Sequence, residues 1–160
     1  ASAVFLLGIS AWLFVFTKPS FDNDQLYNAN FSPYENVVHP IERGAQLEDL
    51  KTQAFAAYED ENYGTALELF KELQQKQGDS YIDFYKALVL MKLNDQQQAI
   101  PLLKSDIAAG GELKDRAIWY LALAHLKQND IAETKKQLKI LVLENGFKAE
   151  AAKELLEALE

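Results

Sequence analysis

One sequence pattern occurs twice in this chain. It reads YKALVLMKLND at residues 85–95 and YLALAHLKQND at residues 120–130, an offset of 35 residues. A looser copy, KTQAFAAYEDENY, occupies residues 51–63. Self-similarity at a period of roughly 20–50 residues is typical of stacked structural repeats, and a period near 34 is typical of helical hairpins. The pattern therefore predicts an all-α chain built from repeated helix pairs.

A second apolar segment follows each copy after a short polar turn. These segments read YGTALELF at 63–70, QQQAIPLL at 96–103 and IAETKKQL at 131–138, and the turns fall at 59–62, 94–95 and 129–130. We expect small residues to face each other across each helix pair, namely Ala54 and Ala66, Ala87 and Ala99, and Ala122 and Thr134. Large residues are expected to fill the gap to the next pair, namely Phe70, Leu103 and Leu138. One pair cannot bury its apolar face alone, so about three are expected to stack.

Three further features complete the predicted repeat region. Pro101 is expected in the first turn of its helix, where the missing N–H costs nothing. The glycine-containing segment 108–112 is expected to form a turn, and residues 147–159 to form the terminal capping helix that a stack of repeats needs.

The first seventeen residues, ASAVFLLGISAWLFVFT, carry no charge. As a helix rising ~1.5 Å per residue they would span about 25 Å of a hydrocarbon core about 30 Å thick. The chain opens with Ala1 rather than methionine, and we expect upstream residues to supply the remaining length. A cleaved signal peptide needs a small-residue cleavage site, which is missing here. A buried core helix would normally show a polar face, and this segment has only Ser2, Ser10 and Thr17 as polar residues. We therefore predict an uncleaved transmembrane anchor.

The charges after this segment predict its orientation. Lys18 is followed by no Lys or Arg until Arg43, whereas cytoplasmic flanks are usually rich in both. We expect a single-pass protein of the inner (cell) membrane whose remaining residues face the periplasm or the cell exterior.

Residues 18–43 are predicted to be a connector, because no period of 2 or 3.6 is sustained there. A short helix is expected near residues 25–28. The aromatic residues Phe21, Tyr27, Phe31 and Tyr34 indicate partial packing on the domain that follows. The predicted organisation is thus an anchor at 1–17, a connector at 18–43 and a helical repeat domain at 44–160.

Composition excludes several functional classes. The chain has 160 residues, a net charge of −8 and no cysteine. An acidic chain lacks the basic footprint that general nucleic-acid binding needs, and thiolate catalysis, disulfides and Cys-based metal sites are excluded. Phosphate loops, zinc-protease helices and nucleophile elbows do not occur. His39 and His125 lie far apart, and His125 is expected to be structural. We expect no enzymatic activity, no cofactor and no metal.

The repeat resembles the tetratricopeptide repeat (TPR) family over residues 47 to about 145. The residues that carry the resemblance are Ala54, Tyr63, Ala66 and Phe70, then Ala87, Ala99 and Leu103, then Ala122, Thr134 and Leu138. The chain departs from the family pattern at Gln96, where a tyrosine is usual, and it lacks the proline at each repeat end. Residues 31–44 also resemble the segment that precedes the repeats in membrane-anchored TPR proteins of the Bacteroidota.

The resemblance implies a concave protein-binding groove lined by the first helix of each pair. Its predicted residues are Phe55, Tyr58, Tyr81, Phe84, Leu88, Met91, Lys92, Trp119, Leu123 and Lys127. Such a surface suits an amphipathic helix or an extended segment with apolar anchors. Two alternatives stay open. Either the connector fills the groove in cis, or the aromatic residues seal one hairpin against the next, namely Tyr81, Phe84, Tyr85, Trp119 and Tyr120.

We therefore expect a membrane-anchored adaptor that binds a protein partner. The alternatives are a structural accessory subunit of an inner-membrane complex and a chaperone-like helper of a translocon.

Overall fold

The computed structural model describes residues 22–41, 49–76 and 79–160. Within these ranges the chain forms helices and no strand, which confirms the all-α prediction. The helices are α2 (Asn23–Asn30), α3 (Leu50–Glu59), α4 (Tyr63–Lys76), α5 (Ser80–Lys92), α6 (Gln96–Ala109), α7 (Lys114–Lys127), α8 (Ile131–Glu144) and α9 (Ala149–Ala158).

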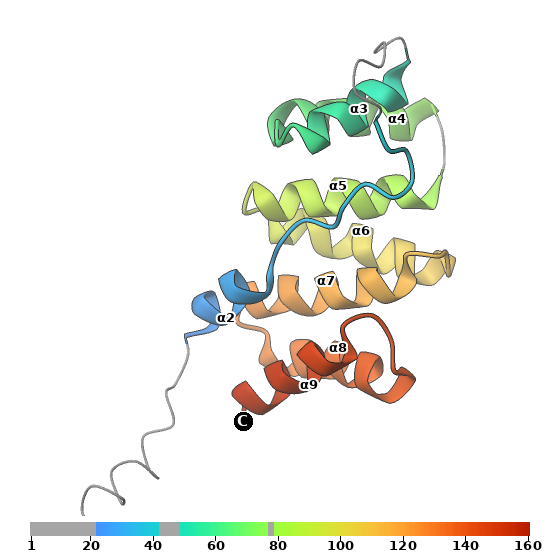
Figure 1. The fold of residues 1–160 in the computed structure, drawn as a ribbon. Helices are drawn as coiled ribbons and strands as arrows, with labels where there is room; N and C mark the ends of the chain where they lie inside the picture. The colour runs from blue at the N-terminus through green and yellow to red at the C-terminus, as the bar shows by residue number, and fades with distance from the viewer. Residues whose placement is uncertain (1–21, 42–48, 77–78) are drawn as a thin grey trace, which may run out of the picture.

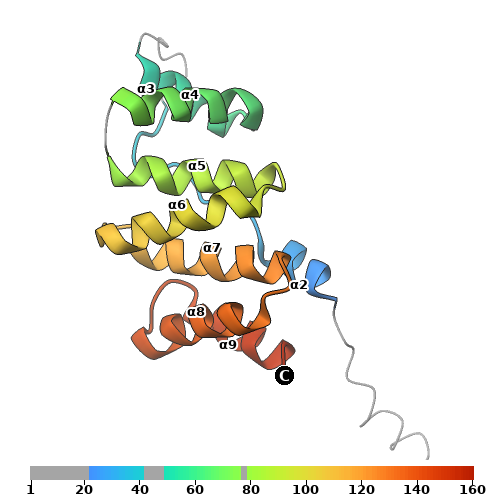
Figure 2. The same ribbon diagram turned by 180° about the vertical axis from the view of Figure 1, so that it is seen from behind.

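The helices form two layers. Helices α3, α5 and α7 lie in one layer, and α4, α6 and α8 lie behind them (Figures 1 and 2). From α3 to α9 each helix packs against the next one in the chain, and α2 packs on α7. The chain thus builds a stack of antiparallel helix pairs, and α9 covers α8 at its end.

The turns inside the second and third helix pairs are both formed by an Asn-Asp dipeptide. Asn94 and Asn129 adopt positive φ angles of 62° and 61°, a conformation that asparagine tolerates better than most residues. The following Asp95 and Asp130 accept hydrogen bonds from the backbone N–H groups that open α6 and α8. The left-handed asparagine and the capping aspartate end one helix and begin the next at both places. The predicted turns at 94–95 and 129–130 are therefore confirmed.

Small residues allow the two layers to approach closely. All six predicted small residues are fully buried: Ala54, Ala66, Ala87, Ala99, Ala122 and Thr134. The Thr134 hydroxyl group donates to the Asp130 carbonyl oxygen at 2.8 Å and lies 3.4 Å from the Ala122 carbonyl oxygen on α7. The large residues Phe70, Leu103 and Leu138 are also fully buried, and the Phe70 ring stacks on that of Tyr85 in the next pair, with centroids 6.5 Å apart.

The expected position of Pro101 is wrong. Helix α6 begins at Gln96, so Pro101 lies inside the helix, in its second turn. Since proline has no N–H, the Gln97 carbonyl group loses its usual i+4 donor. Gln97 is exposed, and water can satisfy that carbonyl group.

In the part of the chain that the structure describes, no helix has the length and apolar character needed to cross a bilayer. The predicted anchor at 1–17 lies outside the described residues.

Candidate functional site

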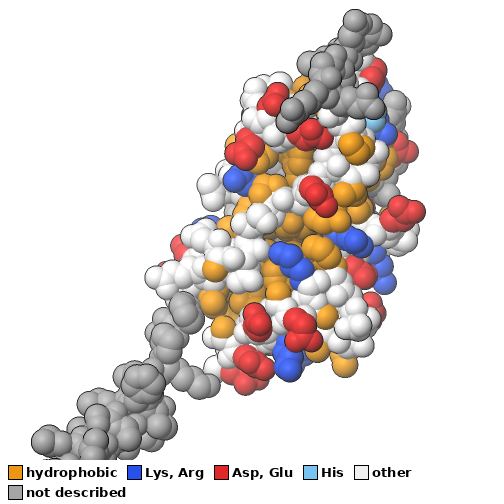
Figure 3. Space-filling view, viewed as in Figure 1, with side chains coloured by type: hydrophobic (Ala, Val, Ile, Leu, Met, Phe, Trp, Pro, Cys, Tyr) orange, Lys and Arg blue, Asp and Glu red, His pale blue; other side chains and the backbone are white. Residues whose placement is uncertain are grey.

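An extended segment crosses the face formed by the odd-numbered helices. Residues 31–41, called the strap below, leave α2 beside α7, pass α5 and end beside α3 (Figure 1). Hydrophobic side chains gather along this face, and both acidic and basic side chains lie around and among them (Figure 3). The strap thus occupies the face that the sequence predicted to be a binding groove.

Three tyrosine hydroxyl groups, one each from α3, α5 and α7, donate hydrogen bonds to strap carbonyl oxygens. They are Tyr58 to Tyr34 at 2.6 Å, Tyr85 to Glu35 at 3.0 Å and Tyr120 to Ser32 at 2.7 Å. The Tyr85 hydroxyl oxygen also accepts a hydrogen bond from the Val37 N–H at 3.1 Å. Because these partners are backbone groups, the bonds select an extended chain rather than a particular side chain.

Burial favours the protonated, neutral form of these three hydroxyl groups. It raises the pKa of Tyr85 to about 12, and it also raises the pKa values of Tyr58 and Tyr120. A phenol buried away from water resists ionisation. All three residues therefore keep their protons at neutral pH and serve as donors.

Tyr34 is the main side-chain anchor of the strap. Its ring meets the rings of Phe84 and Phe147 edge-on, with centroids 6.0 Å and 5.6 Å away. The Arg116 guanidinium group lies 5.7 Å from the Tyr34 ring centroid, and its Nε donates to the Tyr34 hydroxyl oxygen at 3.3 Å. One strap side chain thereby contacts α5, α7 and the segment before α9.

Polar contacts hold the far end of the strap on α3. The Asn36 side chain donates to Glu59 at 2.6 Å and accepts from the His39 N–H at 2.9 Å. The His39 Nε2 atom lies 2.9 Å from the Thr52 hydroxyl oxygen.

The near end of the strap is held through α2. Asp24 pairs with Lys127 at 2.8 Å, and the Lys127 ammonium group lies 5.1 Å from the Tyr27 ring centroid. The expected packing of the connector on the domain is therefore confirmed for the described residues.

Most predicted groove residues do not form an open surface. Seven are buried: Phe55, Tyr58, Phe84, Leu88, Met91, Trp119 and Leu123. The physical reason is that the strap and adjacent helices cover them. Tyr81 is half-buried and Lys92 is exposed, while Lys127 is tied to Asp24. Both alternatives to an open groove are found in part. The strap, which is part of the connector, lies over these residues, and the Tyr85 ring packs against Tyr58 of the preceding pair while its hydroxyl group binds the strap. Partner binding by these residues stays a prediction.

Sequence reasoning did not include Tyr85 and Tyr120 among the groove residues. Tyr85 and Tyr120 occupy the same place in the two closest sequence copies. A buried tyrosine where phenylalanine would pack equally well usually has a hydrogen-bond partner, and that repetition was the available signal.

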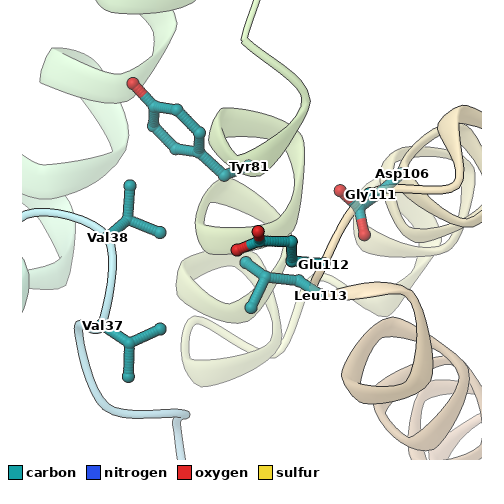
Figure 4. A pocket seen from close by; sticks show the side chains of 7 residues that line it. All are labelled: Val37, Val38, Tyr81, Asp106, Gly111, Glu112 and Leu113. Carbon is teal, nitrogen blue, oxygen red and sulfur yellow. The ribbon is translucent and has the colours of Figure 1, made fainter.

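A cavity opens beside the strap. Val37, Val38, Tyr81, Asp106, Gly111, Glu112 and Leu113 line it, and its volume is about 400 Å³ (Figure 4). Among the described residues, no three His, Asp or Glu side chains are grouped to hold a metal ion.

His125 is buried in α7, where the sequence predicted a structural role. Its Nδ1 atom lies 3.3 Å from an Asp130 carboxylate oxygen, but the contact lacks hydrogen-bond geometry. Burial lowers the pKa of His125, and the nearby Asp130 opposes that shift.

No protein-family model, curated protein or solved structure matches the chain. The class that the structure defines is an all-α protein of stacked helix pairs whose N-terminal connector crosses one face. The resemblance to TPR proteins stays a prediction.

Proposed function

We propose that this protein is a TPR-like helical-repeat adaptor that binds an extended protein segment. In this proposal residues 1–17 anchor it in the cell membrane, and the repeat domain faces the periplasm. One observation supports the binding role above all others. Three helices of the stack each present a tyrosine hydroxyl group to the carbonyl groups of one extended chain.

The strap illustrates the recognition mode that we propose for a partner. Hydrogen bonds to the backbone contribute affinity with little sequence preference, and a buried aromatic anchor adds selectivity. Tyr34 is that anchor here, packed between Phe84 and Phe147. A competing segment would therefore be extended and carry an aromatic residue at the corresponding place.

The covalent link gives the strap an advantage over any competitor. A tethered segment acts at an effective concentration in the millimolar range. A partner must therefore bind more tightly than the strap, or the strap must first be released. Membrane anchoring would likewise concentrate the domain near a membrane-bound partner.

Cleaving the link tests this proposal. A protease site inserted after Arg43 separates the strap from α3 while leaving it attached to α2. After cleavage, a fluorescein-labelled peptide with the sequence of residues 29–42 is added, and its anisotropy is measured. We expect saturable binding that unlabelled peptide abolishes and that Tyr85→Phe weakens. Absence of binding to cleaved protein that circular dichroism shows to be folded contradicts the proposal.

A second candidate is a structural accessory subunit of an inner-membrane complex. The burial of seven predicted groove residues favours it, because a permanently filled groove makes the strap a rigid joint between anchor and domain. This candidate predicts that the cleaved strap stays bound and does not exchange. It also predicts that deleting residues 1–17 releases the protein from the complex.

A further inference from the structure

The cavity beside the strap combines an apolar wall with two carboxyl groups. Val37 and Val38 of the strap form one side, while Asp106 and Glu112 lie across from them beside Leu113 (Figure 4). Its volume of about 400 Å³ falls within the usual range for sites that hold small ligands, roughly 300–1,000 Å³.

Asp106 is the unusual member of this lining. Asp106 is only 1% exposed. Its Oδ2 atom has no hydrogen-bond partner among the described residues. A buried carboxylate without a partner is costly. Burial, helped by Asp83, raises the pKa of Asp106 to about 6. The group is nevertheless mostly ionised above neutral pH, and among the described residues its Oδ2 atom then has no hydrogen-bond donor.

The neighbouring polar groups are engaged elsewhere. Asp83 accepts a hydrogen bond from the Gln74 side-chain amide group. The Lys86 ammonium group donates to the Gln74 side-chain oxygen at 2.7 Å, and the Tyr81 hydroxyl group donates to Asp79 at 2.7 Å. Glu112 also lines the cavity and is exposed, so the Oδ2 atom of Asp106 is the buried lining atom that a ligand can provide with a partner.

We propose that this cavity binds a primary ammonium group carried on an aliphatic stem. The ammonium group lies against Asp106 with Glu112 nearby, and the stem packs on Val37, Val38 and Leu113. A divalent metal ion fits less well, because Ca²⁺ takes six to eight oxygen ligands and the lining offers two carboxyl groups. The ammonium group belongs either to a free alkylamine or to a lysine side chain of another protein.

The strap supplies one wall, so the cavity is complete only while the strap is bound. A ligand in the cavity therefore stabilises the strapped arrangement, since it binds that state alone.

The test uses the full chain in mild detergent at about pH 7.5, followed by ¹H–¹⁵N NMR of the Gly111 and Leu113 amides. The probes are hexylamine and Nα-acetyl-lysine methylamide, and hexanol serves as the neutral isostere. We expect saturable shifts with the ammonium probes. Asp106→Asn weakens binding at least about tenfold, the loss that 1.4 kcal/mol represents. Glu112→Gln weakens it less, and Glu144→Gln, at an exposed position on α8, leaves it unchanged.

Each outcome has one meaning. Saturable binding of hexylamine alone supports a free amine as the ligand, and equal or tighter binding of the lysine probe supports a lysine side chain. The proposal is overturned if hexanol binds as tightly as hexylamine, if Asp106→Asn binds the amine as well as the parent protein does, or if neither ammonium probe saturates. Asparagine keeps the shape of Asp106 and removes a buried charge, so this variant is expected to fold, and Glu112→Gln provides a second test.

Discussion

The hydroxyl group of Tyr120 on α7 donates a hydrogen bond to the carbonyl oxygen of Ser32, 2.7 Å away and 88 residues earlier in the chain. Tyr58 on α3 makes the equivalent bond to Tyr34. In a simple repeat array each unit contacts only its neighbours, and stability is roughly a sum of local terms. The strap links the first helix pair to the third, so we expect the described helices to unfold together.

Tyr120→Phe tests the energetic role of the strap contacts. The substitution removes the hydroxyl group that donates to the Ser32 carbonyl oxygen. We therefore expect the free energy of unfolding to fall by about 1 kcal/mol. Urea denaturation measures the change. Tyr81→Phe is the matched control, because the Tyr81 hydroxyl group bonds the exposed Asp79 instead of the strap. Equal effects of the two substitutions would show that the strap bond contributes nothing specific.

Ala99→Leu tests the close packing of the two layers. Ala99 is a fully buried residue of α6, the helix that packs on α5. Extra methylene groups in a packed core usually cost about 1–3 kcal/mol. We expect a loss of this size in urea denaturation. Ala108→Leu, at an exposed position of the same helix, should leave stability nearly unchanged. If both variants match the parent protein, the layers are not closely packed at Ala99.

Asp106→Asn should stabilise the protein in a pH-dependent way. The pKa of Asp106 is about 6 in the folded protein, above the ordinary value of 3.8 that the unfolded chain has. The folded state therefore binds the proton more tightly. The stability from this group is fully present below about pH 4 and is lost as pH rises through about 6. We expect the variant to be more stable by on the order of 2 kcal/mol at about pH 7.5, with the advantage shrinking as pH falls from about 6 and nearly gone at about pH 4. Chemical denaturation at both pH values checks this, and a constant difference between the two would refute it.

His125→Leu should remove one source of acid sensitivity. Burial lowers the pKa of His125 below its usual 6.5, so the unfolded chain takes up a proton first as pH falls. The stability from this group is present above about pH 6.5 and is lost as pH falls through the lowered value. Leucine occupies the corresponding place in the preceding copy, at Leu90. As pH falls from about 7.5 to 5.5, we expect the melting temperature of the variant to rise relative to that of the parent protein in parallel thermal melts. A difference that stays flat over this interval would contradict the assignment.

The sequence predicted those features that depend on local chemistry. Asn94 and Asn129 with the aspartates that follow them mark turns through backbone conformation and helix capping, and both depend on adjacent residues. The small residues at Ala87 and Ala99 predicted close packing because they recur at the repeat period. Pro101 was misplaced by less than a helical turn, because its position depends on where α6 begins.

The path of the strap could not be predicted in the same way. Phe31 and Tyr34 indicated that the connector packs on the domain, but an extended segment without a period gives no register along a surface. The open groove was inferred by analogy with repeat domains whose face is free. Phe84 is buried with its ring 6.0 Å from that of Tyr34 in the strap. Trp119 is also buried, and the Lys148 ammonium group lies 5.1 Å from its ring centroid.

The central claim is that residues 31–41 lie across the odd-numbered helices of the same chain. Nuclear Overhauser contacts of the Tyr34 ring test it most directly, because the Phe147 and Phe84 ring centroids are 5.6 Å and 6.0 Å away. We predict cross-peaks from Tyr34 to both phenylalanine rings in the full chain. Their absence, together with random-coil chemical shifts for residues 31–41, would contradict the account.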